Sequence, residues 1–127
     1  MNAMDEIPYE PNAWYIFDRG YFDLARLFTA NLIGSNFVIR ERVRLKYEII
    51  EGEDLLECSD NVVKDQTIRL TGQQTARKYP SLLRRIVYYS TEHKRTFTYI
   101  TNRFEISAQH IALLYKNRWQ VELFLSG

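Results

Sequence analysis

Two acidic residues, Asp18 and Glu122, are the strongest candidates for chemistry in this sequence. Asp18 directly follows an apolar run, and Glu122 falls within the apolar pattern of the C-terminal segment. Carboxylates that converge can hold two divalent metal ions roughly 3.5 to 4 Å apart, which activate a water or hydroxyl and stabilise the leaving oxygen in phosphodiester chemistry. Mg²⁺ prefers carboxylate oxygens, so this chemistry needs neither cysteine nor histidine.

The helix that would carry Glu122 is predicted over residues 111–125, and two of its charges lie on its apolar face. At about 100° per residue, Arg118 and Glu122 fall in the middle of the stripe that should enter a core. Burying each ion alone would cost several kcal/mol. The two residues are at i and i+4, so a structural ion pair and a functional carboxylate both remain open. The whole stripe consists of Ile111, Leu114, Tyr115, Arg118, Glu122 and Leu125.

The elements that would position Asp18 form a strand, helix, strand unit. The apolar run at 13–17 predicts a buried strand, residues 21–32 have helical spacing with Gly34 as the stop, and 35–40 predict a second strand. Such a unit indicates an α/β fold, in which ligands bind outside the carboxyl ends of strands. An aspartate at a strand end is also a common turn former or helix cap, so that alternative stays open.

Residues 42–102 have a different, β-rich character. We expect no helix there, a turn at 51–54, a polar loop at 72–80 and a hairpin around 90–94. Ser107 is the predicted N-cap of the closing helix. The expected strands are 43–50, 61–64, 67–71, 82–89 and 95–101.

Basic residues recur through this β-rich segment. Between Arg42 and Arg103, 12 Lys/Arg stand against 8 Asp/Glu, an excess of +4 in a chain whose net charge is +1. Alternating arginines on one strand share a face, where they could contact a phosphate backbone or merely discourage strand aggregation. His93 and His110 have no second ligand nearby and are expected at the surface. The basic positions are Arg40, Arg42, Arg44, Lys46, Arg84, Arg85, Lys94 and Arg95.

The composition indicates a single globular unit. The 127 residues are 46% hydrophobic and 26% charged, which fits one folded domain rather than a disordered chain. No run approaches the roughly 20 apolar residues of a membrane span, and the first residues lack the apolar core of a signal peptide. The single Cys58 cannot form an internal disulfide. We therefore expect no membrane association and a cytoplasmic location.

Three short segments resemble the bacterial DDE transposases of the insertion-sequence-four type. Residues 17–21, Phe-Asp-Arg-Gly-Tyr, are similar to the segment with the family's second catalytic aspartate. The spacing of Tyr115, Arg118 and Glu122 reproduces the family's tyrosine, arginine and catalytic glutamate signature. Residues 99–102 and 111–112 resemble the lead into that helix. The resemblance extends from about Ala13 to Phe124.

The resemblance implies a fold and a set of roles. It implies a partial ribonuclease-H-like core, parts 13–41 and 103–125 of a single 1–127 domain, with a β-rich insertion at 42–102. Asp18 and Glu122 would be catalytic ligands of a two-metal Mg²⁺ or Mn²⁺ site. Tyr115 and Arg118 would support the glutamate and contact DNA. From the basic pattern, the other predicted DNA-binding residues are Arg42, Arg44, Arg84 and Arg85.

The implied reaction is cutting and joining of DNA at transposon ends by a nucleoid-associated bacterial enzyme, dimeric in its full length. The family's first aspartate and the lysine seven positions after its glutamate have no counterparts here, so we expect this chain to be inactive alone. Two other interpretations stay open. The chain could be a non-catalytic DNA-binding or interfering fragment, or the remnant of a decayed gene.

Overall fold

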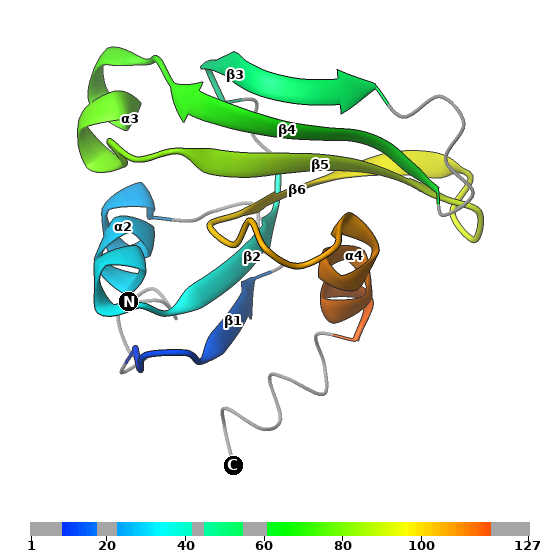
Figure 1. Cartoon of the computed structure of the whole chain (residues 1–127), viewed down its shortest axis with the longest axis horizontal. Helices are drawn as coiled ribbons and strands as arrows, with labels where there is room; N and C mark the ends of the chain where they lie inside the picture. The colour runs from blue at the N-terminus through cyan, green and yellow to red at the C-terminus, as the bar shows by residue number, and fades with distance from the viewer. Residues whose placement is uncertain (1–8, 18–22, 42–44, 55–60, 118–127) are drawn as a thin grey trace.

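The computed structural model of this chain describes residues 9–17, 23–41, 45–54 and 61–117. They form one six-stranded mixed sheet with helices on both of its faces (Figure 1). The strand order is β1-β2-β6-β5-β4-β3, in which β1 and β2 are parallel and all other neighbours are antiparallel. The mixed α/β class predicted from the sequence is confirmed.

The strand, helix, strand unit consists of β1 (Trp14–Phe17), α2 (Leu24–Ile33) and β2 (Asn36–Arg40). The Asp23 side chain caps the start of α2 by accepting from the backbone N–H groups of Ala25 and Arg26. Gly34 ends the helix at φ +93°, a left-handed conformation that favours glycine. The predicted stop at Gly34 and the unit itself are therefore confirmed.

The β-rich segment supplies the other four strands, which extend the same sheet from β2. They are β3 (Tyr47–Asp54), β4 (Val62–Leu70), β5 (Leu83–Ser90) and β6 (Arg95–Thr101). The strand β6 pairs with β2 from Val38↔Thr101 to Arg40↔Tyr99. The predicted hairpin between β5 and β6 is confirmed, because the Lys94 N–H donates to the Ser90 carbonyl across the turn at 2.7 Å.

The predicted turn at 51–54 was wrong, because β3 runs through it. Gly52 pairs with Gln66 in β4, and a Cβ atom on Gly52 would lie 2.8 Å from the Gln66 Cγ. The absence of a side chain at Gly52 therefore lets β3 and β4 lie close together, and the glycine does not form a turn. The separate strands predicted at 61–64 and 67–71 are one strand, β4, whose interior polar residues Asp65 and Gln66 have partners on β5.

The polar loop predicted at 72–80 was also wrong in part. It contains the short helix α3 (Gln73–Lys78), followed by the fully buried Tyr79. None of the residues in α3 is buried, so the helix has no apolar stripe that periodicity could detect. Burial among apolar side chains raises the pKa of Tyr79 above its ordinary value.

The closing helix α4 (Ala108–Lys116) covers one face of the sheet, and α2 and α3 lie over the other (Figure 1). The Ser107 hydroxyl accepts from the His110 N–H at 3.2 Å, which confirms the predicted N-cap. Ile111 and Tyr115 are buried and Leu114 is half-buried, so the described part of the predicted apolar stripe is confirmed. The helix ends at Lys116 with Asn117 as its C-cap, so the prediction of one continuous helix over 111–125 was wrong at that point, and residues 118–125 lie outside the described residues. None of the described helices is long and apolar enough to cross a membrane.

Asn102, directly after β6, joins three elements. Its side-chain oxygen accepts from the Phe37 N–H of β2 at 3.0 Å. Its amide donates to the Asn31 side chain in α2 and to the Ser35 carbonyl, both at 2.9 Å. This partly buried network fixes where β6 leaves the sheet and where the connector to α4 begins.

Candidate catalytic edge and nucleic-acid interface

The parallel strands β1 and β2 end beside each other at one edge of the sheet. Phe17, the last residue of β1, pairs with Ile39, and Arg40 is the last residue of β2. Asp18 is the next residue of the chain after Phe17 and lies outside the described residues. The predicted strand that ends immediately before Asp18 is confirmed, and such carboxyl ends are where α/β folds bind ligands.

Tyr115, in the last turn of α4, is brought to the same end of β2. Tyr115 is 3% exposed, and its ring centroid is 4.8 Å from that of Tyr99. Tyr99 pairs with Arg40 across β6 and β2, and the Arg40 guanidinium carbon lies 5.9 Å from the Tyr115 ring centroid. The closing helix and the β1–α2–β2 unit therefore meet at Arg40. Arg118 and Glu122 lie outside the described residues.

Arg84 and Arg85 point to opposite faces of β5. Arg84 is buried and lies on the face that α4 covers, where it pairs with Asp65 at 2.7 Å. Its Nη1 donates to the backbone carbonyl oxygens of Ile106 at 2.6 Å and Arg103 at 3.3 Å, in the connector that leads into α4. Arg84 therefore holds this connector in place through its hydrogen bonds. The predicted contact of Arg84 with DNA stays a prediction.

Arg85 lies on the face that carries α2 and α3. Its Nη1 donates to the Gln66 side-chain oxygen at 3.0 Å, and its guanidinium carbon is 5.1 Å from the Tyr47 ring centroid. These contacts hold the half-buried guanidinium on the opposite side of the sheet from Tyr115. Arg85 and Tyr115 therefore belong to different surfaces of this domain.

The basic alternation that begins at Arg40 does not lie on one described strand. The strand β2 ends at Arg40, and β3 begins at Tyr47, directly after Lys46. Arg42 and Arg44 lie outside the described residues. A common face for the four basic residues is therefore not seen where the structure describes them, and contacts between DNA and Arg42 or Arg44 stay predictions.

The described residues contain no group of three or more His, Cys, Asp or Glu side chains that could hold a metal ion. Both predicted ligands, Asp18 and Glu122, lie outside these residues, so the fit of a metal rests on the chemistry of the donors alone. His93 and His110 are exposed, as expected. The His93 ring meets the Phe97 ring edge-on at 5.5 Å.

Phe97 was not among the site residues predicted from the sequence. Its ring centroid lies 5.2 Å from the Arg40 guanidinium carbon and 4.7 Å from that of Arg95. A signal was present in the sequence, since Arg95, Phe97 and Tyr99 alternate along one strand and so share a face. Arg40 joins them because it pairs with Tyr99.

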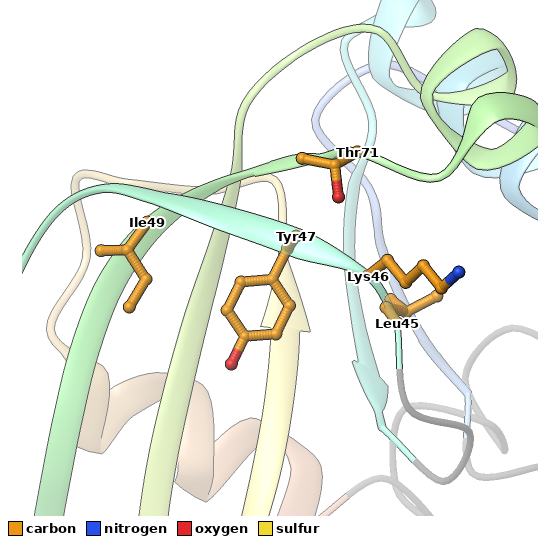
Figure 2. Close-up of a pocket in the computed structure, with 5 residues that line it drawn as sticks. All are labelled: Leu45, Lys46, Tyr47, Ile49 and Thr71. Carbon is orange, nitrogen blue, oxygen red and sulfur yellow. The ribbon is translucent and has the colours of Figure 1, made fainter.

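A shallow depression of about 770 Å³ lies at the opposite edge of the sheet, beside β3. Figure 2 shows Tyr47 and Ile49 projecting from the same side of β3. Tyr47 packs against the core that α2 helps to form, so the depression is on the face opposite α4. It is thus separate from the end of β2 where Tyr115 and Arg40 meet. Its lining residues are Leu45, Lys46, Tyr47, Ile49 and Thr71.

Comparison with known proteins shows the family of this chain. The family model described as "Transposase DDE domain" matches residues 2–126, nearly the whole sequence. The chain belongs to this family. No solved structure matches it significantly.

Two curated relatives are similar to most of this chain. "Putative transposase y4zB" of Sinorhizobium fredii is 32% identical over 125 residues, which are 92% of this chain and 33% of the relative. "Probable transposase for insertion sequence element IS5377" of Geobacillus stearothermophilus is 28% identical over 107 residues, 84% of this chain and 28% of the relative. The chain thus spans about a third of the length of these relatives.

Proposed function

We propose that this chain forms part of a DDE transposase that cuts and joins DNA at transposon ends. The observation that carries the proposal is the contact of Tyr115 with Arg40 at the end of β2. It brings the helix that leads to Glu122 close to the strand end that precedes Asp18. Family membership supports the same activity.

Asp18 and Glu122 are proposed as ligands of Mg²⁺ or Mn²⁺. Two carboxylates supply the oxygen donors that these ions prefer, and neither cysteine nor histidine is required. A bound divalent pair would supply charge stabilisation of the attacking and leaving oxygens. The role proposed for this chain's own residues is to present the two carboxylates from one sheet edge, with Tyr115 and Arg118 supporting Glu122 and contacting DNA.

We further propose that residues 13–41 and 103–125 are parts of a ribonuclease-H-like core and that 42–102 is an insertion. The topology supports this division, because a parallel β1–α2–β2 unit is followed by four strands that all pair antiparallel. In this proposal the insertion widens the core sheet from β2, and α4 returns to it. The insertion-sequence-four type is also part of the proposal.

DNA is the proposed partner, through the basic residues of the β-rich segment. Arg42, Arg44 and Arg85 are proposed to contact the phosphate backbone. Arg84 is proposed to serve the interface by fixing the connector to α4, since its guanidinium is engaged by Asp65. A dimer of the whole protein is proposed by analogy with the family.

Metal and DNA binding by the chain test this function together. Electron paramagnetic resonance of Mn²⁺ should show specific binding that is lost in Asp18→Asn and in Glu122→Gln, while Glu48→Gln, an exposed carboxylate on β3, leaves it unchanged. Fluorescence anisotropy with a labelled DNA duplex should show binding that weakens as salt is raised. DNA binding that survives both carboxylate substitutions, with no specific Mn²⁺ binding in the unmodified chain, would instead support a non-catalytic DNA-binding or interfering fragment.

A further inference from the structure

The Phe97 ring contacts two arginine side chains that come from different strands. The guanidinium carbon of Arg40, at the end of β2, lies 5.2 Å from the ring centroid, and that of Arg95, at the start of β6, lies 4.7 Å from it. These two distances limit the separation of the guanidinium carbons to about 10 Å. Each arginine gains a cation–π contact from the shared ring.

The strand register explains why both charges reach the same ring. Arg95, Phe97 and Tyr99 are alternate residues of β6 and project from one face, and Arg40 faces Tyr99 from the neighbouring strand. Tyr99 in turn packs against Tyr115 of α4. The two arginines therefore lie in a row that begins at the closing helix and runs toward the β5–β6 hairpin.

Two guanidinium groups on one ring present a pair of positive charges, and a polyanion can contact both of them. Arginine suits this task, because its planar fork matches the oxygens of a phosphate. Consecutive charges on a DNA strand are about 3.4 Å apart along the axis, so neighbouring phosphates of one strand can span both guanidinium groups. Arg95 is exposed and Arg40 and Phe97 are half-buried, so the row is open to a ligand.

We propose that Arg40 and Arg95, held on the ring of Phe97, form a subsite for the sugar–phosphate backbone of DNA beside the end of β2. The subsite rests on the proposed function, since it takes DNA as its ligand. It deepens that function by assigning a DNA contact to two of the basic residues, Arg40 and Arg95, and to the ring of Phe97 that holds them, on the face of α4 and toward the β5–β6 hairpin.

The test is the salt dependence of duplex binding by the whole chain, measured by fluorescence anisotropy. Arg95→Gln and Arg40→Gln should each weaken binding several-fold and reduce the slope of log affinity against log salt by about 1, as the loss of one phosphate contact predicts. Arg95→Lys keeps the charge and should keep the slope. Phe97→Leu keeps both charges but removes their platform, so it should weaken binding with little change in slope.

Arg69→Gln is the matched control, because Arg69 is an exposed arginine on β4 that is paired with Glu48 far from this row. It should leave affinity and slope unchanged. Circular dichroism melting checks that each variant is folded, and Arg95, exposed at the start of β6, is the variant least able to disturb the fold. Wild-type affinity and slope in Arg95→Gln would overturn the subsite and leave the proposed function standing. No binding by the unmodified chain at low salt would contradict the proposed DNA function itself.

Discussion

Arg84 and Asp65 form a two-point ion pair between neighbouring strands of the sheet. The Arg84 Nε donates to one carboxylate oxygen at 2.8 Å and its Nη2 to the other at 2.7 Å. The third nitrogen, Nη1, donates to the Ile106 carbonyl at 2.6 Å. One buried guanidinium thus ties β4, β5 and the connector to α4 together, so the position of the closing helix depends on it.

Arg84→Met is therefore expected to lower the free energy of unfolding by about 2 to 3 kcal/mol, less than for a fully buried pair because the Asp65 side chain is 31% exposed. Urea unfolding measures this loss. Arg69→Met, in the exposed pair with Glu48, should cost at most about 1 kcal/mol. Equal losses in the two variants would show that the Arg84 pair is not a structural tie.

Tyr115 is expected to hold α4 on the sheet in addition to any role at the DNA site. Its ring is buried against Tyr99, so Tyr115→Ala should cost about 3 to 5 kcal/mol in urea unfolding. Leu113→Ala, in the same helix but 55% exposed, should change stability by less than about 0.5 kcal/mol. A small effect of Tyr115→Ala would contradict the packing described at the end of β2.

A substitution at Gly52 tests whether residues 51–54 belong to strand β3 and not to a turn. An alanine Cβ at this position would lie 2.8 Å from the Gln66 Cγ and 2.9 Å from its Cα. Gly52→Ala should therefore destabilise the chain by about 1 to 3 kcal/mol, as overpacking does. Its exposed neighbour in β3 serves as the control, and Glu51→Ala should be nearly neutral. A neutral Gly52→Ala would be expected only if this segment were the turn that its sequence suggested.

Tyr79 should make the chain sensitive to alkaline pH. Burial raises the pKa of Tyr79, so the folded state holds the phenolic proton more tightly than the unfolded state does. Stability should be independent of this group below its unfolded pKa of about 10 and should fall as the pH rises above it. Its hydroxyl is buried and has no hydrogen-bond partner among the described residues.

Tyr79→Phe should therefore match or slightly exceed the stability of the unmodified chain at neutral pH, and it should lose less stability above pH 10. Thermal melts at neutral and alkaline pH measure both effects. Tyr89→Phe, an exposed tyrosine of β5, should retain the alkaline loss of the unmodified chain. A clear loss of stability in Tyr79→Phe at neutral pH would reveal a partner for the hydroxyl.

The sequence predicted those elements whose signals are local and apolar. The run that ends at Phe17, the stop at Gly34 and the cap at Ser107 each depend on a few adjacent residues, and all three were found where expected. Gly52, Asp65 and the residues of α3 were misread because their roles depend on partners in other elements. In the sequence alone, Gly52 indicates a turn, although in the structure it leaves room for Gln66. Asp65 likewise indicates the end of a strand, although in the structure it pairs with Arg84 inside the sheet.

The candidate site shows the same limit. Spacing placed Tyr115 on a buried stripe, which is confirmed, but spacing could not show that its ring meets Arg40 from β2. Spacing also grouped Arg84 with Arg85, although consecutive strand residues face opposite sides. The side of the sheet that each arginine serves became evident only from its partners, Asp65 for one and Gln66 for the other.

The central claim, that Asp18 and Glu122 share one metal site at the end of β1, is tested most directly by Fe²⁺-localised cleavage of the backbone. With added hydrogen peroxide as oxidant and ascorbate to regenerate Fe²⁺, Fe²⁺ bound in place of Mg²⁺ generates hydroxyl radicals that cut the chain close to the ion. We predict cuts in both the segment around Asp18 and the segment around Glu122, suppressed by excess Mg²⁺, lost in Asp18→Asn and retained in Glu48→Gln. Cuts confined to one segment, or cuts at both segments that persist in Asp18→Asn, would contradict a shared site.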